Sequence, residues 1–157
     1  MKKWMKYLAL FLISVSLSGC FFFDVGDNLP DVDGWWEFTV DYKDCFCSDG
    51  EVCPAALLQA VGISFPSTKV LRVEFFFDED DEVLHATFYE GAKHLFSLNG
   101  YLEDTGDFMV DGLLGTITIF FDGTFNGDSA DGRTEMDYPL TTEINCGGWG
   151  LFIGAKT

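Results

Sequence analysis

The sequence has little positive charge. Nine Lys and Arg residues stand against 26 Asp and Glu residues, and the formal net charge is -17 at pH 7. An acidic surface repels the phosphates of nucleic acids, so a nucleic-acid partner is not expected. The high charge does not indicate disorder, because 48% of the residues are hydrophobic and 17 are Phe. A chain of 157 residues supports one domain with a real core.

The chain also lacks the common catalytic motifs. It contains no G-x-S-x-G, no H-E-x-x-H, no Walker loop and no G-x-G-x-x-G. The two histidines are His85 and His94, and His85 shares the polar side of its predicted strand with Thr87, as a surface histidine would. We therefore expect no enzymatic activity and no cofactor. A pair of carboxylates of the glycosidase type stays open, since only their separation in space defines it.

No apolar run is long enough for a comfortable membrane span. The first six residues include three lysines, residues 7–16 are mostly apolar, and small residues follow. This order is typical of a secretory signal, and it predicts a signal peptide over residues 1–19. Its removal takes away three lysines and no acids, so the formal charge of the mature chain is -20.

The end of this segment, Leu17-Ser18-Gly19-Cys20, resembles the lipobox of bacterial lipoproteins. That pattern is an aliphatic residue, a small residue, Gly or Ala, and then Cys. The resemblance implies a diacylglycerol on the sulfur of Cys20, cleavage before it, and acylation of the new amino group. Two or more acyl chains give a stable anchor. Position 21 is Phe rather than the Asp that retains enterobacterial lipoproteins in the inner membrane, which favours the outer membrane.

Four further cysteines fit an oxidising envelope, where an even number indicates two disulfides. Cys45 and Cys47 are too close in an extended chain to prefer each other. One of them is expected to pair with Cys53 and the other with Cys146, in an order that the sequence leaves open. A zinc site built from the first three cysteines and a histidine is the alternative, although C-x-C-x₅-C is not a usual spacing for structural zinc.

Most of the remaining sequence predicts strands. We expect a flexible acylated tether over residues 20–33 and a single β domain over residues 34–157. In residues 35–42, Trp36, Phe38, Val40 and Tyr42 alternate with less apolar residues, which indicates a half-buried strand. Residues 54–62 begin with Pro and end with Gly, and they predict one short helix. Strands are expected over residues 35–42, 69–77, 83–89, 94–102, 108–110, 115–125, 133–140 and 146–155.

No βαβ alternation is present, so the sequence predicts an all-β fold. We expect an antiparallel meander of about eight strands that closes into a small barrel, because closure removes the sheet edges. A β-sandwich is the alternative.

Gly34-Trp35-Trp36 is similar to the G-x-W signature of the lipocalin and avidin-like barrels, the calycins. That resemblance implies an early tryptophan that closes the barrel floor. Lipocalins also carry a late arginine that stacks on this tryptophan, whereas the final strand here offers only Lys156. No ligand residues are therefore carried over.

Two groups of residues are candidates for binding. Asp78, Asp80, Asp128 and Asp131 lie in acidic turns that could hold calcium, although neither turn has the EF-hand spacing and a solvated turn is the commoner role. Trp35, Trp36 and Trp149 could line a ligand cavity or fill the core. Pairing of the first and last strands is expected to bring Trp36 and Trp149 together as a plug.

Two functional hypotheses follow. The first is a structural or protein-interaction module, anchored to the outer membrane by its acyl chains, that meets an envelope partner. The second is a lipocalin-like module that binds an apolar or neutral small ligand. A filled interior with an exposed apolar patch favours the first hypothesis, and an open aromatic-lined cavity of about 300 Å³ or more favours the second.

Overall fold

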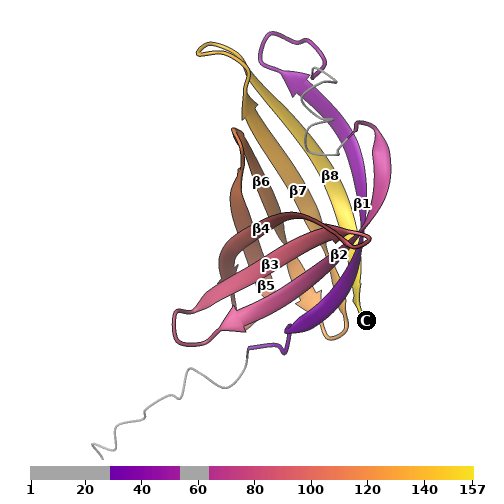
Figure 1. Cartoon of the computed structure of the whole chain (residues 1–157), viewed down its shortest axis with the longest axis vertical. Coiled ribbons are helices and arrows are strands. Elements are labelled where there is room, and N and C mark those ends of the chain that lie inside the picture. The colour runs from indigo at the N-terminus through magenta and orange to yellow at the C-terminus, as the bar shows by residue number, and fades with distance from the viewer. Residues whose placement is uncertain (1–28, 54–63) are drawn as a thin grey trace, which may run out of the picture.

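The computed structural model describes residues 29–53 and 64–157. They form eight antiparallel strands in sequence order, and β1 also pairs with β8, so the sheet closes into a barrel (Figure 1). The predicted all-β meander is confirmed, and the sandwich alternative is wrong. The strands are β1 (Gly34–Cys47), β2 (Ser67–Asp78), β3 (Val83–Glu90), β4 (Lys93–Leu102), β5 (Asp107–Leu114), β6 (Ile117–Asn126), β7 (Ser129–Pro139) and β8 (Asn145–Lys156).

Some predictions fall elsewhere in the chain. The lipobox with Cys20 and the short helix over residues 54–62 lie outside the described residues. A search of the described part for a helix able to cross a membrane finds none.

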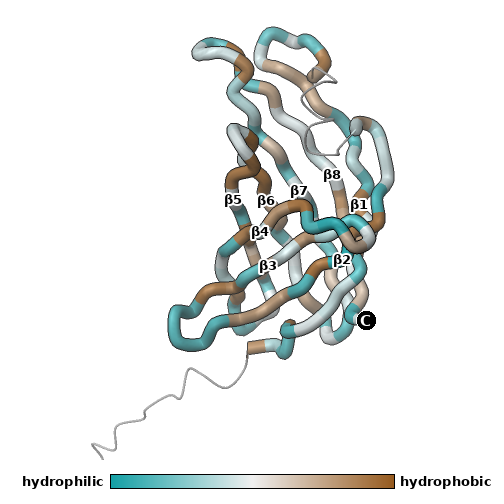
Figure 2. Tube along the Cα trace, viewed as in Figure 1, coloured by the Kyte–Doolittle hydropathy of each residue, from teal (hydrophilic) through white to brown (hydrophobic). Residues whose placement is uncertain are grey.

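Alternation of side chains explains the strands. In β1 the four predicted inward residues are all buried, and the residues between them are exposed or half-buried. The same alternation holds in β2, where Leu71, Val73 and Phe75 are buried, while Phe77 at the strand end is only half-buried. Hydrophilic residues gather at the turns at both ends of the barrel (Figure 2).

The hairpin between β6 and β7 is tighter than predicted. The sequence indicated a turn over residues 126–132, but pairing continues as far as Asn126 and Ser129. Only Gly127 and Asp128 form the turn, and Gly127 has φ of +62°, as two-residue hairpins require. Asp131 is therefore a strand residue, with Ile153 of β8 as its cross-strand partner.

Two disulfides tie β1 to its surroundings. Cys45 bonds to Cys53, and Cys47 bonds to Cys146, its cross-strand partner in β8. The predicted pairing scheme is confirmed, and the structure supplies the order that the sequence left open. Three of the sulfurs lie within 4.8 Å of one another, but as disulfide sulfurs they do not form the alternative zinc site.

The two disulfides should differ in their contribution to stability. The Cys47–Cys146 bond spans 99 residues and the Cys45–Cys53 bond spans 8. Because a longer closed loop removes more entropy from the unfolded chain, we expect Cys47→Ala with Cys146→Ala to lower the free energy of unfolding by about 4–5 kcal/mol. The Cys45→Ala, Cys53→Ala pair should cost about 2–3 kcal/mol. Urea unfolding followed by circular dichroism measures both, and the reverse order would contradict the chain-entropy account.

Candidate interaction surface

Aromatic rings fill much of the barrel interior. Trp36 contacts Phe125 at 4.9 Å between ring centroids, and Phe125 stacks on Phe108 at 4.4 Å. Farther along the barrel, Phe121 contacts Phe88 at 4.6 Å. Further contacts at 4.7–6.1 Å join these rings into one cluster that also includes Phe38, Phe75, Phe96 and Phe152. These aromatic residues therefore serve as core.

The three candidate tryptophans lie in different places. Trp36 is fully buried in the core. Trp35 is half-buried on the outside, where the guanidinium of Arg72 lies 4.4 Å from its ring centroid. Trp149 is 45% exposed and pairs with Asp44, whereas Trp36 pairs with Lys156. The predicted plug of Trp36 and Trp149 is wrong, because antiparallel pairing places the two residues far apart along the β1–β8 ladder and on opposite faces of the sheet.

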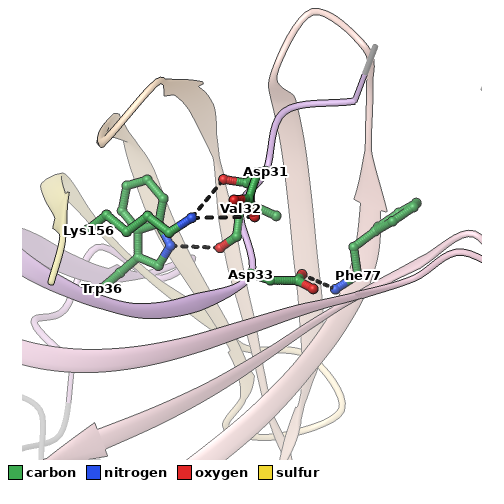
Figure 3. A network of polar contacts seen from close by, with 6 residues as sticks. All are labelled: Asp31, Val32, Asp33, Trp36, Phe77 and Lys156. Carbon is green, nitrogen blue, oxygen red and sulfur yellow. Dashed lines mark hydrogen bonds and ion pairs between the residues drawn. The ribbon is translucent and has the colours of Figure 1, made fainter. Parts of the chain in front are cut away.

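Residues 29–33, which we call the strap, lie against one end of the barrel (Figure 3). The indole Nε1 of Trp36 donates to the carbonyl of Val32 at 2.8 Å, and Val32 itself is 2% exposed. Lys156 Nζ donates to the carbonyl of Asp31 at 2.9 Å, and Asp33 accepts from the backbone N–H of Phe77 at 2.7 Å. The packed domain thus begins before Gly34, and the last residues assigned to the tether belong to it.

Beside the strap is a hollow of about 1030 Å³. Phe77 and Tyr101 contribute aromatic side chains to its lining. Six of its lining residues are acids: Asp31, Asp33, Glu79, Glu82, Glu103 and Asp104. This composition is unlike the mostly apolar lining of a pocket for an apolar ligand.

The calcium candidates do not come together. Asp78 Oδ1 accepts hydrogen bonds from the backbone N–H groups of Asp80 and Asp81, at 3.0 and 3.4 Å, which is a local turn. Asp128 lies in the β6–β7 turn and Asp131 on the outside of β7. Within residues 29–53 and 64–157, the only group of three or more potential metal ligands is the cysteine cluster.

The outer face of β8 carries an apolar row that the sequence reasoning missed. Trp149, Leu151 and Ile153 are 45%, 48% and 66% exposed. They alternate with inward residues, so all three point out of the barrel on one line. We call these three residues the β8 row. Val70 of β2 is also exposed. It is separated from Ile153 by Thr39 of β1, which pairs with both residues.

Glycines explain why these large residues point outwards. The inward positions of β8 include Gly148, Gly150 and Gly154. A Cβ at Gly148 would overlap the ring of Phe65, and one at Gly154 would overlap the ring of Phe38. In residues 148–154, glycines at positions 148, 150 and 154 alternate with large apolar residues, and this alternation was the signal available in the sequence.

Acidic residues flank the β8 row. Trp149 lies between Asp44 of β1 and Glu135 of β7, and Ile153 lies beside Asp131. Leu151 lies between Asp41 and Arg133. The rim of the row is therefore mostly negative.

Two cations form ion pairs with acids of this rim. Lys43 forms an ion pair with Asp41. Arg133 binds Asp122 at 2.8 Å and Glu135 at 3.4 Å. The hydrogen bond that Arg133 donates to Asp122, followed by the charges of Asp122 and Glu135, raises the pKa of Arg133, so this side chain stays charged and bound to carboxylates.

Aromatic rings pack closely against the inner face of β8, so substitution of its inward glycines should lower stability. We expect Gly154→Ala to lower the free energy of unfolding by about 1–3 kcal/mol, because the new methyl group must displace Phe38. Gly147→Ala is the matched control, since it lies on the outer face with its nearest neighbour at 3.4 Å, and it should change stability by no more than about 0.5 kcal/mol. Urea unfolding compares the two, and equal effects would contradict the packing described here.

No family model, no curated protein and no solved structure matches the chain.

Proposed function

We propose that the chain is a lipid-anchored lipoprotein of a bacterial envelope, on the outer membrane, whose acidic barrel is a non-catalytic protein-interaction module. The lipobox resemblance at Leu17-Ser18-Gly19-Cys20 supports the anchor, and the two disulfides fit an oxidising compartment. The observation that carries the interaction role is the exposed β8 row on a barrel whose interior is packed with aromatic rings. Exposed apolar patches with a polar rim mark surfaces that bind other proteins.

The histidines support a non-catalytic role. His85 Nδ1 contacts the side-chain oxygen of Asn99 at 2.8 Å, and His94 Nε2 contacts the hydroxyl of Ser97 at 3.2 Å. Ser97 also donates to Thr87, and the ring of His94 packs edge-on against Tyr89. A serine nucleophile would need a base held by a third polar group, and none of these contacts supplies it.

The strap end supports a second candidate, a lipocalin-like binding module. The hollow of about 1030 Å³ is large enough for a small neutral molecule. Its acids disfavour an anionic ligand, and the amine of Lys156 is bound to the strap. Native mass spectrometry of the intact lipoprotein distinguishes the candidates, because a co-purifying small molecule supports the binding module.

The anchor is tested by cell fractionation. We expect Cys20→Ala to move the protein from the membrane fraction to the soluble fraction, because the sulfur that carries the diacylglycerol is gone. Cys45→Ala with Cys53→Ala removes two other cysteines, which form a disulfide, and should leave the protein with the membranes. Retention of the Cys20→Ala protein in the membrane fraction would disprove the lipid anchor.

The interaction role is tested by photo-crosslinking in intact cells of the native host. A p-benzoylphenylalanine residue at position 153 should give an adduct of discrete mass with an envelope protein. The same residue at position 113 is the control, since Leu113 is 72% exposed on the outside of β5, away from β8. Absence of an adduct from position 153 would contradict an interaction module, and no adduct is expected from position 113.

A further inference from the structure

We propose that the β8 row docks a cationic amphipathic segment of a partner protein, with apolar side chains facing the row and Lys or Arg residues on both sides. This inference rests on the proposed function as an interaction module and names the chemistry of the partner.

The barrel topology determines how such a partner can bind. Both edges of β8 are already paired, one with β1 and the other with β7. A partner strand therefore cannot extend the sheet at β8, and recognition there has to use side chains. The β8 row is about 13 Å long, because alternate residues of a strand lie about 6.7 Å apart. Apolar residues one turn apart on a helix have a similar spacing of about 5.4 Å, so an amphipathic helix matches the row.

The charges beside the row select the sign of the partner. Asp44 and Glu135 flank Trp149, and Asp131 lies beside Ile153. Among the described residues, no ion pair joins Asp44 or Asp131. A partner with basic residues beside its apolar ones would bring opposite charges together at these positions.

Two other occupants fit less well. A second copy of the chain would bring one acidic rim against another, and like charges at an interface are repulsive. A membrane with anionic lipids would be repelled by the same carboxylates and by the formal charge of -20 on the mature chain, which is the -17 of the full chain less three lysines. The same overall charge attracts a cationic partner and accelerates its association.

The test uses the full mature lipoprotein in nanodiscs of zwitterionic lipid. The probes are a fluorescently labelled amphipathic Leu/Lys helical peptide and a Leu/Glu peptide of the same pattern, and fluorescence anisotropy reports binding. We expect the Leu/Lys peptide to bind, with an affinity that falls as salt is added. The Leu/Glu peptide should bind at least about tenfold more weakly.

Variants locate the binding site on the barrel. Ile153→Asp should weaken binding of the Leu/Lys peptide about tenfold or more, because it removes an apolar contact from the row. Leu113→Asp makes the same chemical change at an exposed site on β5 and should have no effect. Asp44→Lys with Glu135→Lys should reduce the preference for the Leu/Lys peptide while leaving the row intact. All variants should unfold at the temperature of the parent, since the substituted side chains point outwards.

Several results would overturn the inference. Equal binding of both peptides, or an equal loss in Ile153→Asp and Leu113→Asp, would show that the row does not select a cationic segment. Self-association that Ile153→Asp abolishes would identify a second copy as the occupant, and binding to phosphatidylglycerol vesicles through Ile153 would identify the membrane. If crosslinks from position 153 persist in any of these cases, only the partner chemistry is wrong; if they too are absent, the proposed function fails.

Discussion

The limited space inside the barrel determines where the large residues of β8 lie. An eight-stranded barrel is just wide enough for side chains to fill it. The rings of Phe38 and Phe65 occupy the room beside Gly154 and Gly148, so no side chain fits at those inward positions. Trp149, Leu151 and Ile153 consequently occupy the outward positions of the strand, the reverse of the usual half-buried pattern. The apolar surface that we assign to a partner is thus a consequence of how the core is filled.

The β1–β8 ladder, which carries this surface, is fixed at both of its ends. At one end of the ladder the Cys47–Cys146 disulfide joins the two strands. At the other end Lys156 binds Asp31 of the strap, and the backbone N–H of Thr157 donates to the carbonyl of Trp35. The β8 row lies between these two attachments, on a part of the sheet that is fixed at both ends. A rigid row costs little conformational entropy on binding, which favours recognition by side chains that are already in place.

The sequence predicted the parts of the fold that depend on local pattern. Alternation in residues 35–42 identified the inward face of β1, and cysteine spacing limited the disulfide pairing to two schemes. Composition could not predict where the β6–β7 turn ends. Ser and Asp are common in turns, but here Ser129 and Asp131 are exposed residues of strand β7. The place of Trp149 depended on its pairing with Asp44 in the β1–β8 ladder that closes the barrel, which no local pattern reports. The strap was also missed, since residues 29–33 gain contacts from Phe77 and Lys156, which are distant in sequence.

Acidic residues around the exposed apolar row oppose self-association of the barrel. Apolar residues on an outward sheet face tend to associate with other copies of the chain, and natural β proteins oppose this with charges placed nearby. Here Asp44, Asp131 and Glu135 lie directly beside the row. Arg133 is bound to Asp122 and Glu135 of its own chain, so it is not free to attract the carboxylates of another copy. Repulsion between two such rims acts against self-association, whereas a cationic partner meets no such barrier. In the interaction that we propose, the scarcity of basic residues therefore has a physical role at this surface: it disfavours a second copy and leaves the apolar contact to a partner of opposite charge.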